Sequence, residues 1–126
     1  MKILIKMQQE KMEAEIDEKK NPKTARAIIQ ALPINGTANR WGDEIYFEIP
    51  VYIKEENSQQ EVEIGDLAYW IEGSCLCIFF GRTPVSVSNK PKAYSPVNVF
   101  GRLTSKDPIN ILKRVKNGEK IRIEKV

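Results

Sequence analysis

Several polar side chains that could bind an anion stand beside glycines at expected strand ends. Glycine permits tight turns, and binding residues are often found on loops that a rigid scaffold holds in place. Arg82 follows Gly81 at the end of an apolar run, where its guanidinium could hold a carboxylate or phosphate through two parallel hydrogen bonds. The hydroxyls of Ser74 and Thr83 could complete such a site. If Arg82 instead pairs with an acid of the segment 43–66, its role is structural.

A second group of candidates is mainly aromatic and would line a cleft. Trp41 stands beside Gly42 in an expected loop and is the best single candidate for ligand contact. Tyr46 lies between two glutamates and is expected to face solvent, whereas Trp70 and Phe80 come from apolar strands that favour the core. The expected ligand-binding residues are Trp41, Tyr46, Tyr69, Ser74, Phe80, Arg82, Thr83 and Asn98.

The composition excludes several kinds of chemistry. Histidine is absent, which removes Ser-His and Cys-His nucleophiles, histidine general bases and most transition-metal sites. Cys75 and Cys77 lie two residues apart in an expected strand, a spacing that aims their side chains badly for a disulfide. We expect two reduced core thiols, no metal and no cofactor.

The charge of the chain is small but unevenly distributed. A net charge of +3 does not argue for nucleic-acid binding. The segment 43–66 carries eight acids, whereas residues 73–106 contain none and hold several lysines and arginines. Either these segments are neighbours that pair across a sheet, or the second forms a basic rim that attracts an anion. Abundant lysine and glutamate also suit a thermophilic source.

The length of 126 residues fits a single domain, residues 1–126. No apolar run approaches the roughly 18 residues that span a bilayer, and residues 1–6 alternate too soon for a signal peptide. We therefore expect a soluble, cytoplasmic protein without membrane contact, whose oligomeric state the sequence leaves open.

The elements that must position these residues are mostly strands. Two apolar runs, 67–70 and 75–80, are separated by Glu72-Gly73-Ser74 and predict two buried strands joined by a turn. The second run has no polar face, which is typical of a strand at the centre of a barrel or sandwich. Residues 83–96 hold three prolines and are expected to form a long loop over the barrel mouth, which could act as a lid.

Alternation and helix-start signals predict the remaining elements. A hairpin is expected over residues 3–16, with a helix over residues 8–20 as the alternative. Asn21-Pro22 predicts a helix start in which Asn21 caps the first turn. A second helix is expected from Asp107-Pro108 to Asn117-Gly118. Further strands are expected at 44–49, 51–53, 97–103 and 120–126.

In this order the elements resemble the cyclophilin-type closed barrel. Residues 21–32, NPKTARAIIQAL, are similar to the first cyclophilin helix, and Gly73-Ser74 and residues 99–102 resemble two later signatures. A closer resemblance is to a small prokaryotic cyclophilin-like family without an established function, through the segments 41–47, 65–70, 79–84 and 97–101. The resemblance implies a mainly β fold, a closed barrel of about eight strands with two short helices.

The same resemblance implies a choice of functions. Cyclophilins isomerise prolyl bonds with a catalytic arginine, and Arg40 lies in the matching segment, although an exposed loop arginine is the alternative. Cys77 and Val97 stand where cyclophilins have a pocket phenylalanine and a histidine. The leading hypothesis is therefore a binding module for a small anionic molecule or an extended, proline-containing peptide at the barrel rim. The alternatives are a weak peptidyl-prolyl isomerase and a structural partner subunit.

Overall fold

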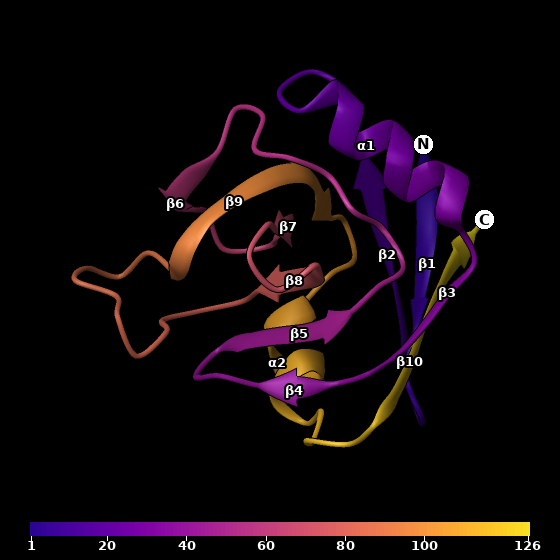
Figure 1. Cartoon of the computed structure of the whole chain (residues 1–126). Helices are drawn as coiled ribbons and strands as arrows, with labels where there is room; N and C mark the ends of the chain where they lie inside the picture. The colour runs from indigo at the N-terminus through magenta and orange to yellow at the C-terminus, as the bar shows by residue number, and fades with distance from the viewer.

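The structure is a computed structural model that describes all residues, 1–126. Its two helices are α1 (Pro22–Ala31) and α2 (Pro108–Lys113). Its strands are β1 (Lys2–Lys6), β2 (Lys11–Ile16), β3 (Ile34–Thr37), β4 (Asn39–Arg40), β5 (Glu44–Glu48), β6 (Gln59–Glu61), β7 (Asp66–Trp70), β8 (Cys75–Phe79), β9 (Lys92–Leu103) and β10 (Lys120–Lys125). The fold is mainly β with two short helices, as predicted (Figure 1).

All strands belong to one curled antiparallel sheet with the order β3-β10-β1-β2-β9-β7-β8-β5-β4, and β6 pairs with β9. The long strand β9 arches between the two halves, pairing with β2 at one end and with β6 and β7 elsewhere (Figure 1). Neither helix is long and apolar enough to cross a membrane.

The sheet has ten strands rather than about eight, and hydrogen bonds do not close it into a barrel. Its end strands, β3 and β4, are separated in sequence by Ala38 alone, too short a link for them to fold back and pair with each other. The backbone of Ala38 bonds instead to Gly118 and Glu119 in the turn before β10. The predicted closure is therefore not confirmed.

The N-terminal hairpin forms as predicted, with Ile5 opposite Met12, and excludes the alternative helix over residues 8–20. Helix α1 begins at Pro22, but the expected cap by Asn21 is wrong. The side chain of Asn21 is buried and instead bonds to Val99 O and Asn57 N. The carboxylate of Glu56 accepts the free N–H groups of Lys23 and Thr24 in its place.

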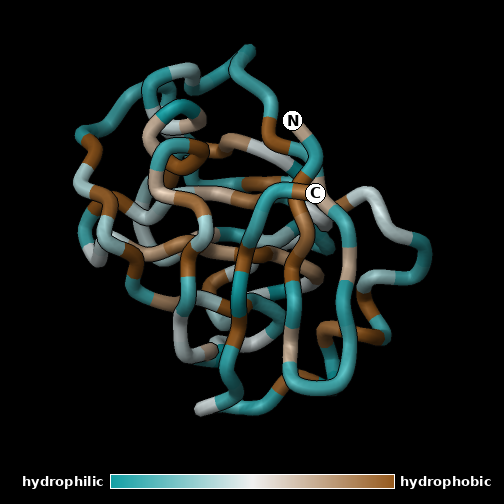
Figure 2. The backbone as a smooth tube through the Cα atoms, turned by 90° about the vertical axis from the view of Figure 1, so that its right-hand side faces the viewer, coloured by the Kyte–Doolittle hydropathy of each residue, from teal (hydrophilic) through white to brown (hydrophobic).

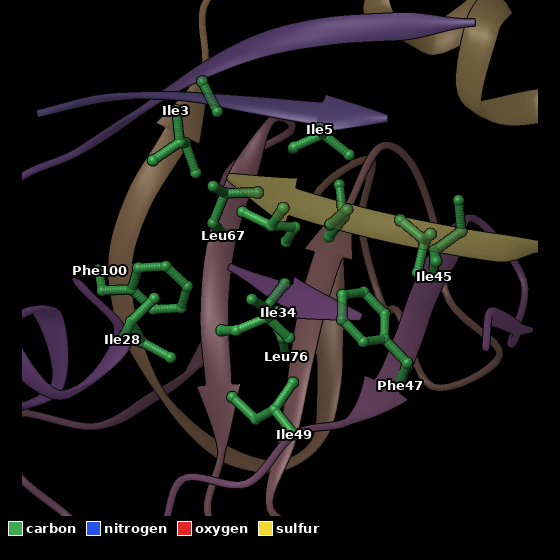
Figure 3. Close-up of a cluster of buried hydrophobic side chains, with 14 of the residues drawn as sticks. Ile3, Ile5, Ile28, Ile34, Ile45, Phe47, Ile49, Leu67, Leu76 and Phe100 are labelled. Carbon is green, nitrogen blue, oxygen red and sulfur yellow. The ribbon is translucent and has the colours of Figure 1, made fainter. Parts of the chain in front are cut away.

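The main core fills the inside of the curled sheet. Isoleucines and phenylalanines from several strands point toward one another there, joined by Ile28 of α1 (Figure 3). Leu112 of α2 packs into the same core. The two helices lie near the two opposite openings of the curled sheet (Figure 1). Hydrophobic and hydrophilic residues alternate along the strands beside the two termini, as a sheet with one wet face requires (Figure 2).

A second, smaller core covers the outer face of β8. It consists of Val62, Ala68, Cys75, Cys77, Phe79, Ala93 and Val97. Strand β8 is therefore buried on both faces, as predicted, and both cysteines are free and buried. The expected loop over residues 83–96 is shorter than predicted, because Lys92–Pro96 already belongs to β9 and pairs with β6.

Candidate functional site

A pocket of about 210 Å³ lies beside this second core, on the outer face of the sheet. All but one of the side chains that line it are hydrophobic, and the exception is Glu44. The lining residues are Trp41, Glu44, Tyr46, Trp70, Ala93, Tyr94 and Val97.

Strand register brings the lining residues to one face. In an antiparallel sheet, residues opposite each other project to the same side. Tyr46 lies opposite Cys77, and Trp70 lies opposite Cys75 on one side and Val97 on the other. Glu44 shares the face of Tyr46 because side chains alternate along a strand.

A tight turn before β5 brings Trp41 to the pocket. Trp41 and Glu44 exchange backbone hydrogen bonds of 3.0 and 3.2 Å. Gly42 within this turn has φ +61°, and a Cβ there would lie 2.9 Å from Pro84 Cδ and 3.0 Å from Arg82 O. The turn therefore needs glycine both for its backbone conformation and for its contact with the segment after β8.

The aromatic rings of the pocket meet edge to face. Ring centroids are 6.1 Å apart for Trp41 and Tyr94, 6.3 Å for Trp70 and Tyr94, and 6.4 Å for Tyr46 and Trp70, with interplanar angles of 79°, 88° and 79°. Trp70 is anchored by a 2.6 Å hydrogen bond from its Nε1 to Ser95 Oγ. The four rings thus form walls that stand nearly perpendicular to their neighbours.

Glu44 is buried in this apolar surrounding, with 6% of its surface exposed. Burial disfavours the charged carboxylate and raises the pKa of Glu44 from 4.5 to about 7, while a hydrogen bond from the Cys77 thiol partly offsets the rise. Burial, together with the nearby carboxylates, also raises the pKa of Cys75 to about 11 and that of Cys77 well above its usual value. Both thiols are therefore protonated at neutral pH.

No lysine or arginine lines the pocket. A thiol is a weak hydrogen-bond donor, so the Glu44 carboxyl retains acceptor capacity that a ligand could use. The site can therefore offer aromatic surface and one buried carboxyl, which is a setting for an apolar ligand with a cationic or hydrogen-donating group.

Only two of the predicted binding residues, Trp41 and Tyr46, line this pocket. Tyr69 belongs to the main core, and its hydroxyl donates to Val51 O at 2.7 Å. Phe80 is also in the main core. Asn98 of β9 is fully buried, and its amide nitrogen donates to the hydroxyl of Thr24 in α1.

The three residues of the expected anion site do not line the pocket either. Ser74 lies in the β7–β8 turn with φ +52°. Thr83 is buried, and its hydroxyl donates to the backbone oxygen of Lys92. Arg82 is exposed and donates to the backbone oxygen of Ser86 at 3.2 Å.

The guanidinium of Arg40 is committed to the backbone. Its Nη1 donates to Lys113 O at 3.2 Å and Val115 O at 3.0 Å, and its Nε and Nη2 donate to Gly42 O. It also lies 5.0 Å from the ring centroid of Phe80. These contacts tie β4 to the end of α2 and leave few donors for a substrate.

Sequence reasoning missed Glu44 and Tyr94, and it considered Trp70 for the cleft but favoured a place in the core. Glu44 alternates with Ile45, a pattern that predicted a wet face for β5. One feature of the sequence did point to the burial of Glu44. Glu44 shares a strand face with Tyr46, and an apolar strand follows in the chain, so another segment could cover that face. Tyr94 lies within residues 83–96, which were expected to form a loop because they contain three prolines. In the structure β9 already begins at Lys92.

Comparison with known proteins agrees with this architecture. The model of the family described as Cyclophilin-like matches residues 1–124. The solution structure of the hypothetical protein AF2241 from Archaeoglobus fulgidus is similar with 47% identity and a TM-score of 0.84, covering 100% of this chain and 95% of that chain. No curated protein sequence matches the chain.

A more distant likeness is to the structure of McbB in complex with tryptophan. The identity is 16% and the TM-score is 0.72, over 98% of this chain and 44% of that chain, so the likeness is one of fold. The match of the family model over nearly the whole chain decides the assignment. The chain belongs to the Cyclophilin-like family.

Proposed function

We propose that this protein binds a small molecule, or the small apolar end of a larger one, in the aromatic pocket. The observation that carries the proposal is the meeting of Trp41, Trp70 and Tyr94 around the buried carboxyl of Glu44. Apolar pockets with a few convergent polar groups and a shifted pKa are the usual form of a ligand site.

Two further observations support this proposal. Both tryptophans of the chain line the pocket, whereas tryptophan is normally among the residues that a small domain uses to fill its core. In addition, a protein of the same fold, McbB, has been solved in complex with tryptophan, a small aromatic molecule.

The pocket does not favour the anionic ligand expected from Arg82. An anion would be desolvated beside Glu44 without a cation to compensate for the lost hydration. Nor does any contact favour prolyl isomerisation, because the guanidinium of Arg40 is occupied by backbone oxygens. A family fold alone does not establish that activity.

The two indole N–H signals in a ¹H–¹⁵N NMR spectrum provide a direct test, since both come from pocket residues. Titration with benzyl alcohol and with 3,3-dimethylbutan-1-ol is expected to shift these two signals and the amide of Glu44. Replacing Tyr94 by alanine should weaken binding about fivefold or more, because the ligand would lose the apolar area that it buries against the tyrosine ring.

Tyr94 and Tyr52 form a matched pair for the control. Both are exposed, by 65% and 82%, so neither substitution should unfold the protein, but Tyr52 does not line the pocket. Tyr52→Ala is expected to leave both affinities unchanged. Signals that shift only outside the pocket, or equal losses in the two variants, would contradict the proposed function.

A further inference from the structure

The four aromatic rings of the pocket surround a space that has a single carboxyl group in its lining. We propose that this pocket is an aromatic cage for a methylated ammonium group, with Glu44 as the counter-ion. The inference rests on the proposed function and specifies the chemistry of the ligand.

The ring geometry is the first support. A cation is attracted by the face of an aromatic ring and repelled by its edge, and tryptophan attracts it most strongly. Neighbouring rings in the series Trp41, Tyr94, Trp70 and Tyr46 stand at 79° to 88° to one another. Rings in this arrangement enclose a corner with faces on more than one side, which is how a compact, rounded cation is held.

The charge of the site is the second support. A cation that enters an apolar pocket loses its hydration and needs a compensating negative charge. Glu44 supplies that charge from within the lining, and no lysine or arginine there competes for it. Methylation spreads the charge over apolar methyl groups, which match the hydrophobic side chains of Ala93 and Val97.

The size and opening of the pocket are the third support. Its volume of about 210 Å³ lies below the roughly 300–1,000 Å³ of pockets that hold whole drug-sized ligands, so it fits a head group. Tyr94 is 65% exposed and forms a wall at the surface. The remainder of the ligand can extend into solvent, and the methylated ammonium could therefore belong to a free small molecule or to a methylated lysine of a peptide.

Choline and 3,3-dimethylbutan-1-ol are the probes for the test, because they have the same shape and differ only in the positive charge. Isothermal titration calorimetry at pH 8 and constant ionic strength compares their affinities under conditions in which most Glu44 is ionised. Choline is expected to bind about tenfold or more tightly than the neutral alcohol.

Two variants separate the contributions of charge and aromaticity. Glu44→Gln should remove most of the preference for choline over the alcohol, since glutamine keeps the shape of the side chain but carries no charge. Tyr94→Leu should reduce the preference about threefold, because leucine retains apolar contact but lacks the ring face. Tyr52→Leu, outside the pocket, should change neither affinity.

The results distinguish this inference from the proposed function. If the alcohol shifts the pocket signals but choline binds no more tightly, the cage is contradicted and the pocket remains a neutral ligand site. If neither probe binds, both proposals fail. If choline binds more tightly than the alcohol, a peptide with trimethyllysine is compared with its unmodified form. Binding of choline but not of the methylated peptide indicates a free small molecule as the ligand. Tighter binding of the methylated peptide than of the unmodified one indicates a lysine side chain.

Discussion

Replacing Glu44 by glutamine is expected to remove most of the pH dependence of folding stability between pH 5 and pH 8.5. Burial raises the pKa of this carboxyl from 4.5 to about 7, so the folded state favours its neutral form. The stabilisation that this neutral form provides is fully present below pH 4.5 and is lost as the pH rises through about 7. With 1.36 kcal/mol for each pKa unit, the wild-type protein should lose about 3 kcal/mol in this interval.

The measurement is urea denaturation of wild type and Glu44→Gln at both pH values. Glutamine cannot ionise, so the variant should be more stable than wild type at pH 8.5 and nearly equal to it at pH 5. Glu48→Gln is the matched control, because Glu48 lies on the same strand face but is exposed. Parallel pH profiles of wild type and Glu44→Gln would show that Glu44 has an ordinary pKa.

Replacing Asn98 by alanine is expected to cost about 3–4 kcal/mol of folding stability. Its amide nitrogen donates to Thr24 Oγ1 at 3.0 Å and Lys54 O at 3.1 Å, and its amide oxygen accepts from Glu56 N at 3.1 Å. Alanine would leave these groups without partners around a cavity, because the site is fully buried.

The loss is large because Asn98 connects three parts of the fold, namely β9, the first turn of α1 and the segment before β6. The denaturation midpoint in urea checks it, with Asn89→Ala as the control for an exposed asparagine. A loss below about 1 kcal/mol would be typical of a surface position and would contradict the burial of this amide.

The elements predicted best are those set by local signals. Pro22 and Pro108 mark the helix starts, because proline is favoured at the first helical position. Alternation predicted the β1–β2 hairpin, and the apolar run of β8 predicted a strand with two buried faces. Local signals did not predict the cap of α1, because it comes from a distant part of the sequence. Glu56, thirty-five residues after Asn21, accepts the free N–H groups at the start of α1.

The candidate site was predicted only in part for the same reason. Trp41 and Tyr46 could be chosen from their own surroundings, a glycine turn and a polar strand face. The burial of Glu44 depends on Trp41 and on β9, whose residues Ala93, Tyr94 and Val97 line the same pocket. Alternation within β5 carries no information on that cover, so a carboxyl expected in water lies in an apolar pocket.

The role of Glu44 as a buried counter-ion is tested by its pKa, followed through its ¹³C carboxyl signal by NMR. The signal is identified by its loss in Glu44→Gln, and the titration is run without ligand and with saturating choline. A buried carboxyl that serves as counter-ion should titrate near pH 7 in the free protein and at a lower pH with choline, because a bound cation favours the ionised form. A pKa near 4.5 that choline does not move would contradict both the burial and the binding role of Glu44.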